Sequence, residues 1–180
     1  MNWYDNIIKK IYNLYKGEEM QKHNVGSYVR VSQDCIDMIN HFEGWENEAY
    51  WDKFGQVWTI GVGFTKGVKK GDYLTDEQIE KRLHEELKDY TSGVKRSVKT
   101  PITQGMFDAC VSFSFNLGNG AFASSTLLEK LNDGDYKGAS NEFPKWVYAG
   151  GKKLLGLQRR RDAERLMFLS KDWHDYRRDW

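Results

Sequence analysis

Two carboxylates in an aromatic-rich stretch, Glu43 and Asp52, have the types and surroundings that glycoside hydrolysis requires. That reaction needs one carboxyl group that keeps a proton for the leaving oxygen and a second that stays ionised. Glu43 follows an apolar helix face and lies between Phe42 and Trp45, where burial would favour the protonated form. Asp52 falls in a hairpin-like segment, where hydration would keep it ionised, and Thr59 adds a hydroxyl on the next predicted strand. Because acidic residues are abundant on protein surfaces, the pair alone does not establish an activity.

The elements that position these residues follow from capping and periodicity. Ser32 can cap a helix whose apolar positions recur every three or four residues, and Gly44 ends it. Residues 49–65 combine aromatic and β-branched side chains with glycines, which predicts a small antiparallel sheet with tight turns. The first carboxylate therefore falls at a helix end and the second on a hairpin.

The rest of the chain is predicted to be helical. Residues 75–78 have the form of a capping box that opens a long, charged helix to about Tyr90, which could connect two lobes. Thr103 can cap an apolar helix fit for a core, and residues 116–120 read as a turn. Shorter helices are predicted at roughly 125–132, 136–148 and 157–169. This order predicts an α+β fold with a small antiparallel sheet lobe and a larger helical lobe joined by the long helix.

Several motifs follow one another along the chain in a defined order. They are Glu43-Gly44, Asp52, Thr59-Ile60-Gly61-Val62-Gly63, Phe115-Asn116-Leu117-Gly118, Trp146, and Gly156-Leu157-Gln158-Arg159-Arg160-Arg161 with Glu164. In this combination the chain resembles the phage-type lysozymes, glycoside hydrolase family 24, over about residues 29–170. The resemblance implies a lysozyme-like fold and an endolysin that hydrolyses bacterial peptidoglycan for host cell lysis.

The resemblance also implies a role for each residue of the constellation. Glu43 matches the general acid, Asp52 the residue that orients the attacking water, and Thr59 the hydroxyl that holds this water from the other side. The implied target is the β-1,4 bond from N-acetylmuramic acid to N-acetylglucosamine, cleaved by single displacement with inversion. Two positions depart from the family pattern. Gln56 lengthens the hairpin by one residue, and Phe64 stands where many members have a histidine.

Four further residues are candidates for substrate binding: Phe115, Asn116, Trp146 and Arg159. Aromatic faces and amides suit pyranose rings and N-acetyl groups, although Phe115 and Asn116 could equally be a core aromatic and a turn-stabilising amide. One arginine of the run that begins at Arg159, and Arg159 by preference, would hold the catalytic acid or bind the carboxylates of peptide stems. The alternative for these arginines is pairing along their own helix.

Composition narrows the class of protein further. The chain has 180 residues, of which 39% are apolar, enough for one domain or two lobes around a shared helix. A net charge of +1 argues against an obligate nucleic-acid binder.

From Lys145 onward, ten Lys/Arg against five Asp/Glu give a balance of +5, which could steer a carboxylate-bearing polymer or form a solvated helix face. Cys35 and Cys110 are predicted to be buried, reduced thiols, and the scattered histidines predict no metal site. We expect a monomer that needs no cofactor.

Residues 1–28 are predicted to form an amphipathic helix and a linker ahead of a lysozyme domain at 29–180. The apolar stripe of that helix could pack on the domain, meet a partner or lie on a membrane surface. Charged residues interrupt any signal-peptide run, so we expect synthesis in the host bacterial cytoplasm and action on the cell wall after release. Two rival functions stay open: a lytic transglycosylase, which needs the acid but not the held water, and a wall-binding or membrane-perturbing protein.

Overall fold

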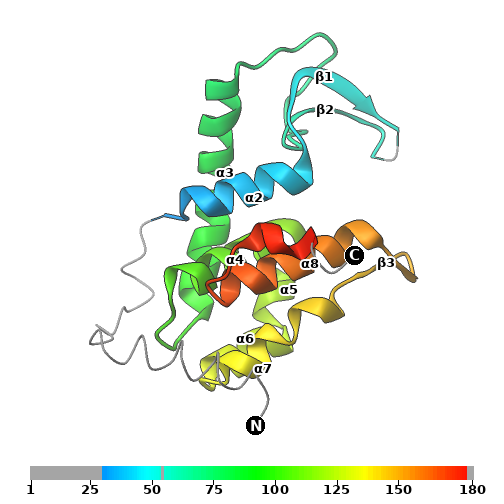
Figure 1. Ribbon diagram of the computed structural model, residues 1–180. Coiled ribbons are helices and arrows are strands. Elements are labelled where there is room, and N and C mark those ends of the chain that lie inside the picture. Colours follow the sequence, from blue (N-terminus) through cyan, green and yellow to red (C-terminus); the bar gives the residue numbers. More distant parts are fainter. Residues whose placement is uncertain (1–29, 54, 178–180) are drawn as a thin grey trace.

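The computed structural model describes residues 30–53 and 55–177 (Figure 1). The predicted N-terminal helix and linker, residues 1–28, lie outside this part, so the boundary near residue 29 and the membrane contact stay predictions. The described elements are α2 (Gln33–Glu43), β1 (Glu46–Asp52), β2 (Val57–Gly61), α3 (Asp76–Ser97), α4 (Gln104–Leu117), α5 (Asn119–Ala123), α6 (Thr126–Asn132), α7 (Tyr136–Ser140), η2 (Phe143–Lys145), β3 (Tyr148–Ala149), β4 (Lys152–Lys153), α8 (Leu155–Phe168) and η3 (Trp173–Arg177). Within these ranges no helix has the length and apolarity needed to cross a membrane.

A small sheet lobe and a larger helical lobe are joined by α3 (Figure 1). In the sheet lobe β1 pairs antiparallel with β2, and residues 72–74 add backbone hydrogen bonds to β1. In the helical lobe α4 packs against α8, α3 and α2, and its residues from Phe107 to Ser114 are all buried. The predicted α+β class, with two lobes and a connecting helix, is confirmed.

The first turn of α2 is fixed to α4 by a buried carboxylate. Ser32 caps α2, since its hydroxyl accepts a hydrogen bond from the Cys35 amide at 3.3 Å. The same hydroxyl donates to Asp108 at 2.6 Å, and the Ser32 amide donates to it at 3.2 Å. Gln104 donates to Asp108 as well, at 2.8 Å. The start of the helix that ends in Glu43 is therefore held by the core of the helical lobe.

We expect the stability of the wild type, relative to an Asp108→Asn variant, to fall as the pH rises. Burial raises the pKa of the Asp108 carboxyl above its usual value, although hydrogen bonds from Ser32 and Gln104 oppose the shift. The folded state then holds this proton more tightly than the unfolded chain does. The stabilisation is complete below a pH of about 4 and is lost as the pH rises through the folded pKa. Urea unfolding over a pH series measures the difference, and a difference that grows with pH in favour of the wild type would contradict this prediction.

The β1–β2 hairpin places alternate residues on opposite faces. Its register pairs Tyr50 with Thr59, Trp51 with Trp58, and Asp52 with Val57. Gln56, the additional residue predicted from the family pattern, lies in the turn with a φ of 51°. The turn therefore absorbs the longer hairpin without disturbing this pairing.

The end of β2 requires a glycine, because the Phe64 ring packs directly against Gly61. Gly61 has a φ of 67°, and a Cβ atom there would lie 2.6 Å from the Phe64 ring. The backbones of Ile60 and Phe64 exchange two hydrogen bonds, and Phe64 is buried. The Arg82 guanidinium lies 4.4 Å from the centre of the Phe64 ring. Phe64, which stands where many family members have a histidine, is thus a buried core residue whose ring contacts the Arg82 guanidinium.

Two helix predictions and one turn prediction differ from the structure. The helix predicted to end near Tyr90 continues to Ser97, and the predicted turn at 116–120 contains the start of α5. The helix predicted at 136–148 is wrong, because α7 ends at Ser140 and is followed by η2 and the β3–β4 hairpin. Pro144 in η2 lies inside the predicted range and cannot continue an α-helix. The two cysteines are free and buried, as predicted, and burial raises the pKa of both thiols.

Candidate active site

Glu43 is the last residue of α2 and contacts α8. Gly44 follows with a φ of 88° and turns the chain towards β1. Arg160 Nη1 donates to Glu43 Oε1 in an ion pair; the side chain of Arg160 is 4% exposed and that of Glu43 is 24% exposed. The predicted arginine for this position was Arg159, which is exposed. Adjacent helical residues point about 100° apart, so only one of the two can face α2.

Glu164 organises a buried polar network behind this ion pair. It is fully buried and accepts hydrogen bonds from Arg160 Nε at 3.2 Å, Arg161 Nη2 at 2.9 Å and Ser112 Oγ at 2.8 Å. Arg161 Nη2 also donates to Asn116 Oδ1 at 2.9 Å. Asn116, a predicted substrate-binding residue, is therefore linked to the ion pair through the network.

The network balances its charges. Two guanidinium groups, Arg160 and Arg161, face two carboxylates, Glu43 and Glu164, and three of the four residues are buried. Buried charges are tolerated only when they are paired in this way. Within residues 30–53 and 55–177, Arg160 Nη2 has no hydrogen-bond acceptor. This donor is buried, so the network leaves one N–H of Arg160 unsatisfied behind Glu43.

Asp52 and Thr59 occupy the same face of the hairpin. Thr59 pairs with Tyr50, and Asp52 is two residues further along β1, so all three side chains share a face. A Cβ atom on Gly55 would lie 2.8 Å from Asp52 Oδ2, so the glycine leaves room for this carboxylate. Thr59 is 4% exposed, and its hydroxyl donates to the Val57 carbonyl at 3.5 Å.

Two tyrosines lie in the electrostatic field of Glu43. Burial raises the pKa of Tyr50, and the negative charges of Asp52, Glu46 and Glu43 contribute to the same shift. Burial also raises the pKa of Tyr90 on α3, where Glu43 again contributes. The negative charge of Glu43 therefore contributes to the raised pKa of one phenol in the sheet lobe and of another on the connecting helix. Neither tyrosine was predicted as a site residue, although strand alternation could have placed Tyr50 with Asp52.

The remaining predicted substrate-binding residues occupy different surroundings. Phe115 is half-buried and packs edge-on against Tyr90, with 5.3 Å between the ring centres. Trp146 is half-buried and packs edge-on against Phe113 in the core, at 5.2 Å. Arg159 projects from the surface of α8. Of these three, Phe115 is the one that contacts Tyr90.

His41 faces the C-terminal segment. Its Nε2 atom shares a 2.7 Å hydrogen bond with the Tyr176 hydroxyl, and Arg177 Nη2 lies 3.4 Å away. Burial and the positive charge of Arg177 lower the pKa of His41. η3 is therefore bound to α2 through His41, which precedes Glu43 by two residues.

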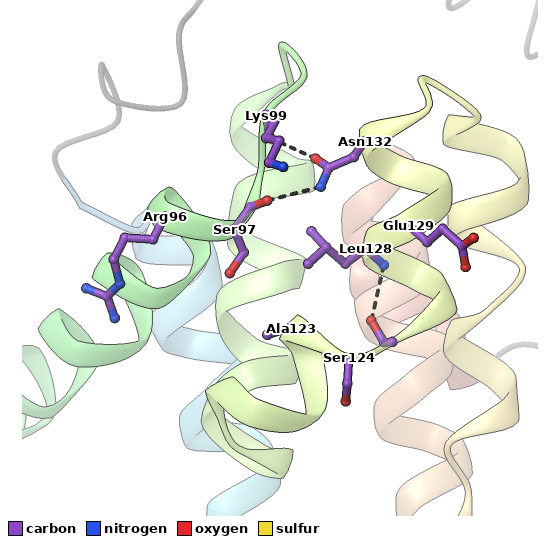
Figure 2. Close-up of a pocket in the computed structure, with 9 residues that line it drawn as sticks. Arg96, Ser97, Lys99, Ala123, Ser124, Leu128, Glu129 and Asn132 are labelled. Carbon is purple, nitrogen blue, oxygen red and sulfur yellow. Dashed lines mark hydrogen bonds between the residues drawn. The ribbon is translucent and has the colours of Figure 1, made fainter.

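A separate hollow of about 410 Å³ lies at the C-terminal end of α3, beside α5 and α6 (Figure 2). Asn132 borders it, accepting from the Lys99 amide at 2.7 Å and donating to the Ser97 carbonyl at 3.0 Å. Arg96 and Glu129 give its rim charges of both signs. None of its lining residues belongs to the Glu43 network or to the predicted site.

A two-lobed α+β fold with a glutamate held at a helix end, beside a hairpin that carries a second carboxylate, is the arrangement of a lysozyme-like enzyme. The model of the phage lysozyme family matches residues 40–164. The endolysin of Acyrthosiphon pisum secondary endosymbiont phage 1 is 42% identical over 146 residues, which cover 79% of this chain and 99% of that protein.

Solved structures agree with this assignment. A mutant of P22 lysozyme superposes with a TM-score of 0.73 at 34% identity, covering 79% of this chain and 99% of that one. The muramidase domain of SpmX from Asticaccaulis excentricus gives a TM-score of 0.72 at 33% identity, over 78% of this chain and 97% of that domain. The chain therefore belongs to the phage lysozyme family, as its motifs predicted, and is a lysozyme that acts on the peptidoglycan of the cell wall.

Proposed function

We propose that this lysozyme hydrolyses the β-1,4 bond from N-acetylmuramic acid to N-acetylglucosamine, with Glu43 as general acid. The ion pair of Glu43 with the buried Arg160 is the observation that carries the proposal. Because Arg160 is itself held by Glu164, the acid keeps one position relative to the hairpin that bears Asp52. One chain supplies all of these side chains, so we propose that the enzyme acts as a monomer.

In the proposed reaction Glu43 acts in its protonated form, in which it can still accept the hydrogen bond from Arg160, and gives its proton to the glycosidic oxygen as the bond to the anomeric carbon breaks. N-acetylglucosamine leaves with a free hydroxyl. A water molecule held by Asp52 and Thr59 attacks the anomeric carbon from the opposite side, and Asp52 takes its proton. Arg160 then stabilises the carboxylate that Glu43 has become. The product is a muramic acid reducing end of inverted configuration.

Digestion of purified peptidoglycan in water enriched with oxygen-18 tests this reaction. We expect reducing muramic acid ends that carry one labelled oxygen and that appear first as the α anomer. Unlabelled anhydro-sugar ends would instead identify a lytic transglycosylase. A labelled β anomer appearing first would show retention and would remove the water-activating role from Asp52. Mass spectrometry reads the label, and proton NMR of early products reads the anomer.

We expect Asp52→Asn to lower kcat on peptidoglycan by about 10²- to 10³-fold, because an amide cannot take the proton of the attacking water. The urea-unfolding midpoint should change little, since the replacement keeps the shape of the side chain. Glu48→Gln is the matched control, an exposed acid on the same strand, and should keep wild-type activity. A fully active Asp52→Asn variant would rule out the proposed water activation.

A further inference from the structure

The β3–β4 hairpin directly precedes α8, and its tight turn fixes its backbone conformation. Gly150 and Gly151 form its turn with φ angles of 56° and 75°. Two consecutive residues of positive φ are the signature of a two-residue type I′ turn, whose twist matches that of the strands. The register pairs Tyr148 with Lys153. These residues are therefore presented on a fixed scaffold.

The surface of this hairpin is cationic and aromatic. Tyr148 is 65% exposed. No acidic residue occurs in positions 143–161. Within the described part of the chain, Lys152, Lys153 and Arg159 have no carboxylate within ion-pair distance. Because these exposed cations, two on the hairpin and one on α8, have no ion pair with the residues that the structure describes, the surface can receive an anionic ligand.

Along the chain, the hairpin directly precedes the helix whose Arg160 pairs with Glu43. α8 begins at Leu155, directly after β4, and Arg160 of α8 pairs with Glu43. The helical rise between these two positions is about 7.5 Å. In Figure 1 the β3–β4 hairpin and the β1–β2 hairpin extend towards the same side of the molecule.

We propose that the β3–β4 hairpin binds the carboxylates of the peptide stems of peptidoglycan through Lys152 and Lys153. This inference rests on the proposed function, because the stems are attached to N-acetylmuramic acid, the sugar whose bond is cleaved. A strand bound at Glu43 therefore carries carboxylates close to the hairpin. Tyr148 offers an apolar face to the stem beside Lys153, its register partner, and Lys152 adds a second cation on the opposite face of the hairpin. Each exposed contact is weak, so the effects of the two lysines are removed together in the test, and their sum depends on salt.

The test compares peptidoglycan that keeps its stems with the same glycan after an amidase has removed them. The variant Lys152→Ala/Lys153→Ala should lose about fivefold in kcat/KM on the stem-bearing substrate, through KM, and nothing on the stem-free glycan. The loss should disappear at about 0.5 M salt. Lys69→Ala/Lys70→Ala removes another adjacent pair of exposed lysines and should behave as the wild type on both substrates.

An equal loss on both substrates, or no loss on the stem-bearing one, overturns the proposal. So does a variant with unchanged wall kinetics that no longer sediments with phosphatidylglycerol vesicles, because the lysines would then serve a membrane. A wild type that releases no reducing ends from either substrate contradicts the proposed function itself. That result is distinct from equal cleavage of both glycans by wild type and variant, which overturns the hairpin proposal alone.

Discussion

Replacing Glu43 with glutamine is expected to lower kcat on peptidoglycan by about 10³-fold or more. The amide keeps the size of the side chain and can still accept a hydrogen bond from Arg160, but it has no proton to give to the glycosidic oxygen. Since the leaving group would then depart as an unprotonated alkoxide, binding should persist while the chemical step fails. The assay counts reducing ends and, in parallel, follows the turbidity of cells whose outer membrane has been removed.

Glu46→Gln provides the control for Glu43→Gln. Glu46 is an exposed acid three residues away, at the start of β1, and its replacement should leave kcat unchanged. Circular dichroism of the Glu43→Gln variant verifies that its fold is intact. If the folded variant lyses cell walls at the wild-type rate, Glu43 is not the acid.

The largest effect on stability is expected at Glu164. Glu164→Gln removes one of the two negative charges that neutralise the buried guanidinium groups of Arg160 and Arg161. An uncompensated buried charge costs about 3–5 kcal/mol of unfolding free energy. Urea unfolding at neutral pH, followed by tryptophan fluorescence, measures this loss. Activity should fall as well, because Arg160 positions Glu43.

A double variant separates charge from packing in this network. Glu164→Leu combined with Arg161→Met removes a buried positive and a buried negative charge together, so it should be more stable than Glu164→Gln. Glu85→Gln breaks the exposed ion pair with Lys88 and should leave the unfolding midpoint unchanged. A Glu164→Gln variant as stable as the Glu85→Gln control would show that the buried charges are not coupled.

Local signals in the sequence predicted the fold well where neighbouring residues determine the structure. The caps at Ser32, Thr75 and Thr103 each accept the expected backbone hydrogen bond, because capping depends on three or four consecutive residues. The predicted helix at 136–148 fails for a related reason. Pro144 lies inside the predicted range and is a local signal against an α-helix there, and the structure has α7 ending at Ser140 with η2 after it.

The site was only partly predictable. Glu43, Asp52 and Thr59 stand in an ordered motif, and strand alternation places the last two on one face. The choice of Arg160 over Arg159 depends on the rotation of α8 relative to α2, which packing decides and local sequence does not. The same holds for Glu164, whose burial could not be distinguished in the sequence from an ordinary helical pair.

The contacts of α2 with α8 and η3 have a consequence for how the enzyme folds during its synthesis. Arg160 follows Glu43 by 117 positions, and Tyr176 follows His41 by 135. Contacts of such high sequence separation close long loops and form late in folding. During synthesis the acid leaves the ribosome long before the groups that hold it. A nascent chain without α8 therefore carries the glutamate but lacks the cation that positions it.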